Sequence, residues 1–125
     1  MSGKKSHEKG KRFERAVAKA FGTERIGLQG KFDEDHSDVK HHELFIQCKA
    51  RKDLSIYTWF DKTVEESPEN KIPIVVAKAN MKRPLVVIDL EEFIQIYQRL
   101  DEYHEEYNIM IQKAASEIQR EGKDG

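Results

Sequence analysis

The sequence has few of the features that define several large protein classes. Its 125 residues, enough for one small domain, include one cysteine, three prolines and one tryptophan. A single cysteine excludes disulfide bonds within the chain and suits a reducing compartment, so we expect a cytoplasmic protein. No hydrophobic run approaches the roughly 20 residues of a transmembrane helix. The basic first residues are not followed by the apolar stretch of a signal peptide, and we expect no membrane partner.

The net charge is also small, at −1, although 36% of the residues are charged. The charges are unevenly distributed. Residues 1–52 hold 13 Lys/Arg and 8 Asp/Glu, a balance of +5, whereas residues 91–125 hold 4 and 9, a balance of −5. A basic first half can bind phosphate groups even when the whole chain is nearly neutral. An ordinary mixed surface is the alternative that charge alone leaves open.

The hydrophobic periodicity predicts an α/β chain. In order, we expect a helix at 8–22, a strand at 25–28, a polar loop at 30–42, a strand at 43–50, a helix at 58–67, buried strands at 72–79 and 84–89, and a helix from about 90 to 120. This order predicts one domain over residues 1–90 with a mixed β-sheet flanked by helices, then a long C-terminal helix at 91–120 and a disordered tail at 121–125.

The predicted C-terminal helix carries an apolar seam with alternating steps of four and three residues. Only His104 interrupts the seam with a polar side chain. A seam of this length exceeds what so small a domain can cover, so we expect the helix to dimerise; folding back over its own sheet is the alternative. The seam residues are Phe93, Tyr97, Leu100, His104, Tyr107, Ile111, Ala114 and Ile118.

Four polar residues could converge on one cleft. Gln47 and Lys49 lie on one face of the strand at 43–50, a face that begins with an apolar side chain and becomes polar. If residues 38–40 form a neighbouring strand, Asp38 lies beside them, and Glu14 borders the apolar stripe of the first helix. Carboxylate and amide oxygens suit Mg²⁺, which supports phosphodiester hydrolysis, while a lysine can stabilise the charged transition state.

These residues resemble the signature of the PD-(D/E)XK nuclease superfamily, which appears here as Ser37-Asp38 followed by Gln47-Cys48-Lys49. The order "KGKRFERAVAKAFG", then the aspartate, then "LFIQCKAR" and "IPIVVAKA", is similar over residues 8–90 to the small dimeric Holliday junction resolvases of archaea and phages. The resemblance implies a restriction-endonuclease-like fold and Mg²⁺-dependent cleavage, with Mn²⁺ as a substitute. It also implies catalytic roles for Glu14, Asp38, Gln47 and Lys49, with the first three as metal ligands.

Two residues depart from that pattern. Gln47 stands where an Asp or Glu is usual, which resembles the QxK variant of Mrr-like restriction nucleases, and Ser37 stands where Pro is usual. Glutamine keeps a carbonyl oxygen but removes one negative charge, so metal affinity should fall unless an acid of the 33–35 segment helps. Ser37 would neighbour the scissile phosphate. The residues expected to contact DNA are Lys11, Arg12, Arg25, Ser37, Arg51 and Lys52.

The sequence leaves several functions open. The first is a homodimeric, metal-dependent endonuclease that cuts branched DNA, with the Holliday junction as substrate. An Mrr-like restriction or DNA repair nuclease is a second possibility, and a branched-DNA-binding protein whose catalysis is weakened by Gln47 is a third. A structural protein that works through its heptad helix is a fourth. Each of the singled-out polar residues also has an ordinary reading, as a solvated helix acid, a turn residue or a basic strand end.

Overall fold

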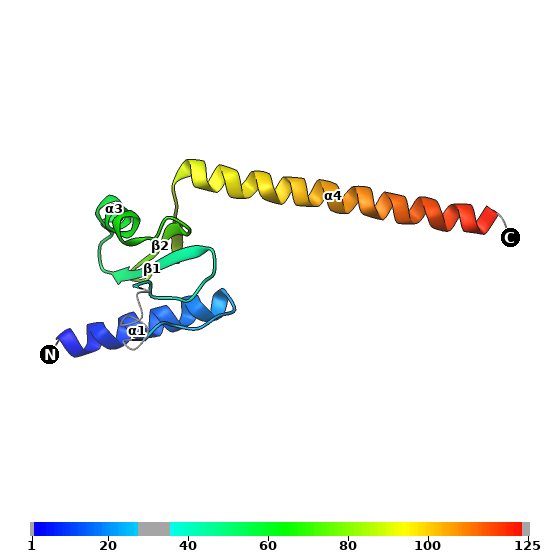
Figure 1. Cartoon of the computed structure of the whole chain (residues 1–125). Helices are drawn as coiled ribbons and strands as arrows, with labels where there is room; N and C mark the ends of the chain where they lie inside the picture. The colour runs from blue at the N-terminus through cyan, green and yellow to red at the C-terminus, as the bar shows by residue number, and fades with distance from the viewer. Residues whose placement is uncertain (1, 28–35, 124–125) are drawn as a thin grey trace. The chain divides into compact units, whose positions relative to one another are not determined.

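The computed structural model describes residues 2–27 and 36–123, with the side chains of residues 2–6 and 123 left out. The chain divides into two units, residues 1–89 and residues 90–125. The first unit contains helices α1 (Ser2–Ala20) and α3 (Ile56–Glu66) and strands β1 (Leu44–Arg51), β2 (Ile72–Ala79) and β3 (Leu85–Val87). The second unit is helix α4 (Leu90–Lys123). Figure 1 shows these elements along the chain.

The strands form a three-stranded mixed sheet in the order β1-β2-β3. β1 pairs with β2 in parallel, so that Gln47 lies opposite Val75. β2 pairs with β3 antiparallel, and Val75 lies opposite Val87. Parallel strands need a crossover connection, and α3 provides it between β1 and β2. This architecture confirms the predicted α/β class with a mixed sheet, flanking helices and a long C-terminal helix.

The sheet lies between two helices (Figure 1). On one face, Ile46 and Cys48 of β1 join Ile74 and Val76 of β2 in a cluster with α1 residues, of which Val17 is 6% exposed. Because strand side chains alternate, Phe45 and Val75 point to the opposite face, where both are buried. Each fully buried side chain of this size contributes about 1.5–3 kcal/mol, so the two central strands hold the unit together.

A glycine ends α1 where the sequence predicts the stop. Gly22 has a φ of +70°, which glycine adopts without strain. The amide of Gly22 donates to the Lys19 carbonyl, and the Thr23 amide donates to the Ala18 carbonyl. These two bonds form a Schellman motif, which satisfies carbonyls of the last helical turn. The helix is longer than predicted at its other end, since it begins at Ser2 rather than residue 8.

The strand predicted at 25–28 does not form, and the possible strand at 38–40 is reduced to single bridges. Arg25 and Val39 form only an isolated antiparallel bridge, and Val39 forms another with Ile46. Residues 25–27 are therefore not a strand, and residue 28 lies outside the described residues. The segment around Val39 still runs beside β1, because the Asp38 amide donates to the Ile46 carbonyl at 2.9 Å. This single-residue pairing is enough to bring Asp38 to the edge of β1.

The last strand is less buried than predicted, and the last helix extends beyond residue 120. β3 is three residues long and lies at the sheet edge, with Leu85 and Val86 about half exposed. A β-branched run indicates a strand but does not say that both of its faces are covered. α4 continues to Lys123, so residues 121–123 of the predicted disordered tail are helical. Residues 124–125 lie outside the described part of the chain.

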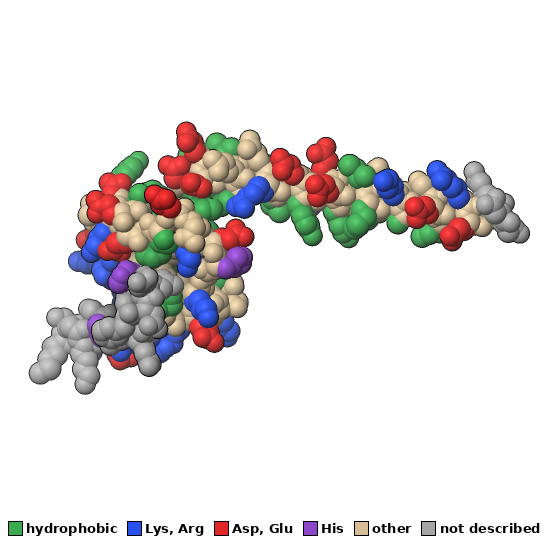
Figure 2. All heavy atoms as spheres, viewed as in Figure 1, with side chains coloured by type: hydrophobic (Ala, Val, Ile, Leu, Met, Phe, Trp, Pro, Cys, Tyr) green, Lys and Arg blue, Asp and Glu red, His purple; other side chains and the backbone are tan. Residues whose placement is uncertain are grey.

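α4 is a helix of 34 residues on which large apolar side chains remain exposed. Figure 2 shows hydrophobic side chains gathered along one side of its middle portion. The exposed apolar side chains of α4 include members of the predicted seam, such as Leu100, Tyr107 and Ile111, which are 50%, 50% and 47% exposed. Charged residues are interspersed along α4. Within the described residues, no helix is both long enough and apolar enough to cross a bilayer.

Candidate active site

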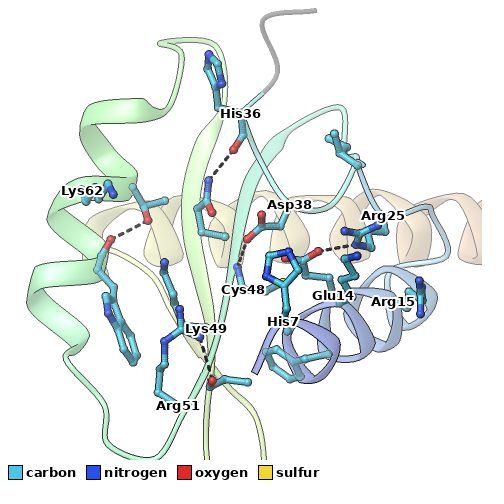
Figure 3. A pocket seen from close by; sticks show the side chains of 18 of the residues that line it. His7, Glu14, Arg15, Arg25, His36, Asp38, Cys48, Lys49, Arg51 and Lys62 are labelled. Atoms are coloured by element: carbon cyan, nitrogen blue, oxygen red, sulfur yellow. Dashed lines mark hydrogen bonds and ion pairs between the residues drawn. The ribbon is translucent and has the colours of Figure 1, made fainter. Parts of the chain in front are cut away.

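The four predicted catalytic residues line one cavity of the first unit, although they come from three separate segments. Glu14 lies on α1, Asp38 on the segment that bridges to β1, and Gln47 and Lys49 on β1 itself. The cavity has a volume of about 880 Å³. Figure 3 shows Glu14 and Asp38 on one side of it and α3 with Lys62 on the other. The expectation that these side chains share a cleft thus agrees with their placement.

Asp38 is held in place by main-chain hydrogen bonds on both of its sides. Its carboxylate Oδ2 accepts the Cys48 amide at 2.9 Å, while its own amide donates to the Ile46 carbonyl at 2.9 Å. Its carbonyl in turn accepts the Ile26 amide at 2.9 Å. The carboxylate therefore takes the part of a strand partner for β1, whose edge has no full neighbouring strand on this side among the described residues. At 7% exposure, Asp38 is a buried acid fixed to the middle of β1, at Ile46 and Cys48.

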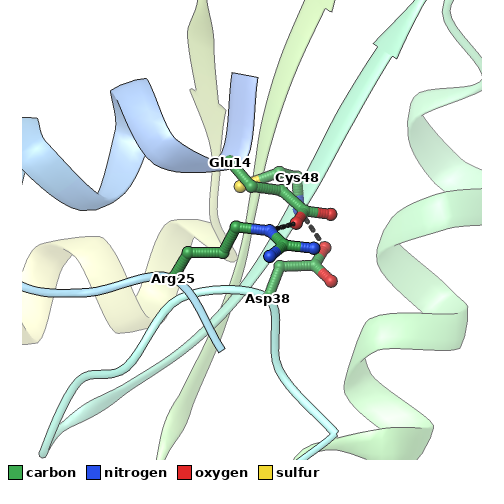
Figure 4. Close-up of polar contacts among 4 residues, drawn as sticks. All are labelled: Glu14, Arg25, Asp38 and Cys48. Atoms are coloured by element: carbon green, nitrogen blue, oxygen red, sulfur yellow. Dashed lines mark hydrogen bonds and ion pairs between the residues drawn. The ribbon is translucent and has the colours of Figure 1, made fainter. Parts of the chain in front are cut away.

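Glu14 is paired with a cation inside the site. Its Oε2 accepts a hydrogen bond from Arg25 Nε at 2.6 Å, and the two side chains are 19% and 25% exposed. Figure 4 shows the carboxylates of Glu14 and Asp38 pointing the same way, with Arg25 between α1 and the Asp38 segment. A charge-assisted bond of this length limits the rotamers of Glu14 and partly neutralises its charge. Arg25 therefore positions the helix-borne acid.

Gln47 is oriented by a backbone carbonyl. Its Nε2 donates to the His36 carbonyl oxygen at 2.9 Å. Since that carbonyl can only accept, the contact assigns the amide nitrogen to the His36 side. The remaining Oε1 is a hydrogen-bond acceptor or a metal ligand. Gln47 is 9% exposed, so this orientation is enforced in a nearly closed environment.

The cavity has a positive balance of charge. Six cationic side chains line it, against three carboxylates, which leaves a balance of +3. The Cys48 thiol lies beside the buried Asp38 carboxylate. Burial first, and then the charge of Asp38, raise the pKa of Cys48, so this cysteine stays neutral. Such a cavity attracts anions, and a polyanion most of all. The cations are Lys11, Arg15, Arg25, Lys49, Arg51 and Lys62, and the carboxylates are Glu14, Asp38 and Glu66.

A comparison with protein families decides the identity. A family model described as "Phage putative PDDEXK endonuclease" matches residues 5–124, which is nearly the whole chain. The chain belongs to this family. The suspected membership of the PD-(D/E)XK nuclease superfamily is thereby confirmed, and the chain is a nuclease of the endonuclease type. No curated protein and no solved structure matches the chain in the corresponding searches.

Within this endonuclease, the predicted DNA contacts fall into two groups. Lys11, Arg25 and Arg51 line the cavity. Arg12 and Lys52 are exposed and do not line it. Ser37, expected beside the scissile phosphate, is fully buried, and its hydroxyl donates to the Val39 carbonyl at 3.3 Å. In this structure Ser37 therefore supports the backbone turn that carries the neighbouring aspartate, and its hydroxyl does not face the cavity.

Sequence reasoning missed the wall of the cavity that α3 supplies. Trp59, Lys62, Thr63 and Glu66 line it, and none of them is among the predicted site residues. These four positions follow i, i+3, i+4 and i+7, the spacing of one helix face. That periodicity is visible in the sequence, but it mixes aromatic, basic, hydroxyl and acidic side chains and so gives no hydrophobic signal. His7 on α1 also lines the cavity and was not predicted. It lies one helical turn before Lys11, again on a helix face without a hydrophobic signal.

The ligand set is small but suits magnesium. Across residues 2–27 and 36–123, no three His, Cys, Asp or Glu side chains are grouped to hold a metal ion. The cavity instead offers two carboxylates, Glu14 and Asp38, with the Gln47 carbonyl as a third oxygen donor. Mg²⁺ keeps several water ligands and is commonly bound by one or two carboxylates together with substrate phosphates. The residues present therefore fit a divalent ion that binds together with DNA.

Proposed function

We propose that this chain is a homodimeric, metal-dependent endonuclease that hydrolyses phosphodiester bonds in branched DNA, with the four-way Holliday junction as its substrate. The observation that carries the proposal is the meeting of Glu14, Asp38, Gln47 and Lys49 in one cavity that also holds five other cations. The preference for a junction rests on the similarity of residues 8–90 to junction resolvases in the order and length of their elements.

The metal ligands in this proposal are Glu14, Asp38 and the Oε1 atom of Gln47. Mg²⁺, for which Mn²⁺ would substitute, would supply charge neutralisation at the phosphate and activation of water when bound there. The protein's own contribution is positional. The Cys48 amide fixes the Asp38 carboxylate, Arg25 fixes Glu14, and the His36 carbonyl orients the Gln47 amide.

In this proposal Lys49 is the residue that stabilises charge during the reaction. It follows Gln47 by two residues on the same strand face and is partly exposed toward the cavity. Its ammonium group would stabilise the negative charge that develops on the scissile phosphate. Lys11, Arg51 and Lys62 would bind adjacent phosphates, and Arg12 and Lys52 would contact DNA farther from the cut. Binding through so many cations should weaken steeply with salt.

One observation keeps a second function in view. Gln47 replaces the usual acid, and its amide nitrogen is already bonded to the His36 carbonyl. A site with one carboxylate fewer holds a divalent ion less tightly, so a branched-DNA-binding protein with weakened catalysis would use the same cavity. A restriction or repair nuclease related to the Mrr group differs from the favoured proposal only in its substrate.

A cleavage assay with four substrates separates these functions. Purified chain is incubated with a four-way junction, a Y-fork, a plain duplex and a methylated duplex, with Mg²⁺, with Mn²⁺ and with EDTA. We expect metal-dependent nicks in the junction at least about 100-fold faster than in the duplex. Preferential cutting of methylated duplex would support the restriction nuclease instead. Salt-sensitive junction binding without cleavage in either metal would support the binding protein.

The role of Lys49 is tested with a matched pair of variants. Lys49→Ala should reduce cutting by about 10²- to 10³-fold, the usual effect of removing one electrostatic stabiliser, while junction binding changes little. Lys82→Ala removes an exposed lysine from the turn between β2 and β3, outside the cavity, and should cut like the wild type. Unchanged cutting by Lys49→Ala would refute the assigned role.

A further inference from the structure

The apolar side chains of α4 form a continuous stripe that is wider than the predicted seam. The seam positions of the heptad, from Phe93 to Ile118, are joined along one edge by Ile96, Tyr103 and Met110. Tyr103 and Met110 are 68% and 60% exposed, and the seam residues of the same unit are about half exposed. Two of the four heptads carry three apolar residues each, and the other two carry two, with His104 and Glu117 at the remaining positions. Such a face is of the kind that packs against another helix.

The stripe is large enough for a specific interface. A buried aromatic side chain covers about 150–250 Å². Phe93, Tyr97, Tyr103 and Tyr107 are each half exposed or more. Together they offer about 400 Å² per copy, and thus about 800 Å² in a pair before any aliphatic side chain is counted; stable interfaces bury about 1,200–2,000 Å².

The charges of α4 favour a partner that runs in the opposite direction. Residues 90–106 hold six Asp/Glu and one Arg, a balance of −5, whereas residues 107–123 hold two Glu and three Lys/Arg, a balance of +1. Two parallel copies would place the acidic halves side by side. Two antiparallel copies place each acidic half beside the weakly basic half of the other, which removes that repulsion.

Side-chain size selects the same orientation and a single register. When Phe93 is aligned with Ile118 of the second copy, Tyr97 meets Ala114, Leu100 meets Ile111, and His104 meets Tyr107. Every seam residue thus finds a partner, and the large Tyr97 faces the smallest seam residue. A parallel pair would stack Tyr97 on Tyr97 and leave Ala114 opposite Ala114, which combines overpacking with a cavity.

The second edge of the stripe agrees with this register. Reversing one helix brings the same edge of the two stripes together, so Tyr103 lies beside Met110 of the second copy. In a parallel pair Tyr103 and Met110 would instead face the opposite edge, which carries Ile94, Asp101 and Asn108 and is polar beside them. Along this edge, Tyr103 and Met110 therefore pack on each other only in the antiparallel arrangement.

We propose that the apolar stripe of α4 binds the same stripe of a second copy of the chain in antiparallel orientation, with Leu100 opposite Ile111. This inference rests on the homodimer in the proposed function and adds its interface. Each nuclease unit is joined to α4 at residue 90, so the two attachment points lie at opposite ends of the helix pair, roughly 45 Å apart at a rise of 1.5 Å per residue. The dimer would present two active units that do not compete for one end.

Two substitutions of exposed isoleucines test the surface. Ile111→Glu places a charge in the stripe, whereas Ile109→Glu places the same charge two residues away, about 200° around the helix. Both side chains are about half exposed, so neither change disturbs a core. In sedimentation equilibrium of the full chain, Ile111→Glu should raise the dimer dissociation constant at least 100-fold, and Ile109→Glu should change it by less than 3-fold. A monomeric wild type, or equal effects of the two variants, would overturn the proposal.

Disulfide trapping tests the orientation. Full-length Tyr97→Cys and Ala114→Cys chains are mixed, oxidised and mapped by mass spectrometry; the native Cys48 is buried and should not compete. We expect disulfides between position 97 of one chain and position 114 of the other. Disulfides that join 97 to 97 and 114 to 114 would show a parallel pair and overturn the orientation. Metal-dependent nicking by dissociated Ile111→Glu would leave the nuclease assignment intact, so the two proposals can fail separately.

Discussion

Replacing Asp38 in two ways separates its structural contribution from its proposed chemistry. Asp38→Ala removes the acceptor of the buried Cys48 amide, whose partner is the Asp38 carboxylate at 2.9 Å. A hydrogen bond to a charged acceptor contributes about 1.5–3 kcal/mol, and leaving the donor unsatisfied incurs the upper end of that range. Asp38→Asn keeps a carbonyl acceptor of the same shape and loses only the charge, which costs about 1 kcal/mol.

These free energies translate into distinct melting temperatures. For a unit of 89 residues, 1 kcal/mol shifts the midpoint by about 4–8 °C. Asp38→Ala, at about 3 kcal/mol, should therefore melt about 12–24 °C below the wild type, and Asp38→Asn about 4–8 °C below it. The one tryptophan, Trp59, lies on α3 in the same unit, so its fluorescence reports this transition. EDTA keeps metal binding out of the comparison.

Unlike the stability, the cutting activity should fall to a similar extent in both Asp38 variants. Both variants lack the carboxylate, so both should lose junction cutting by at least about 100-fold, as when a single electrostatic group is removed. Equal destabilisation of the two variants would refute the structural account of the Cys48 contact. Cutting by Asp38→Asn at the wild-type rate would refute the metal-ligand assignment, whatever its stability.

Two further substitutions test the polar contacts beside β1. Gln47→Glu should bind Mn²⁺ more tightly in calorimetry, yet be less stable without metal because its carboxylate faces the His36 carbonyl; weaker metal binding would contradict the ligand role. His41 Nδ1 accepts the amides of Glu43 and Leu44 at 3.0 Å, and burial, followed by the adjacent imidazole, lowers the pKa of His41 below its ordinary 6.5. Its contribution to stability is thus present above pH 6.5 and is lost as the pH falls through the lowered pKa. Urea midpoints should fall from pH 7 to pH 5 less in His41→Asn than in the wild type, and parallel curves would exclude this contribution.

The central strands were predictable because their signals are local. Residues 72–79 form β2 with the predicted bounds, and β1 differs from its prediction by one residue at each end. Both segments are apolar, and their alternation or β-branched content carries over directly to the pleated backbone. The polar switch from Phe45 to Gln47 and Lys49 marks where β1 leaves the core. That switch, together with the preceding Asp38, was enough to predict the wall of the cavity that β1 and its neighbouring segment form, but not the wall that α3 forms.

The rest of the site depends on distant packing and could not be read from short stretches. Ser37 and Asp38 are adjacent, yet the Ser37 hydroxyl donates to the Val39 carbonyl whereas the Asp38 side chain lines the cavity. The bridge that Val39 makes to β1 decides which of the two side chains points to the cavity. No local sequence pattern predicts that contact. Likewise, Lys62 enters the site only because the crossover helix lies across the sheet from α1.

The contact with His36 also gives a physical reason for glutamine in the signature. Position 47 must place one oxygen toward the cavity while its other terminal atom lies 2.9 Å from the His36 carbonyl oxygen. An amide satisfies both demands, because it carries a donor beside its acceptor. A carboxylate there would set two oxygens in contact at low exposure, at the cost of an unsatisfied or repulsive buried pair. The neutral residue therefore reflects how the 36–38 segment packs on β1, and Gln47→Glu should function only if that carbonyl can move away.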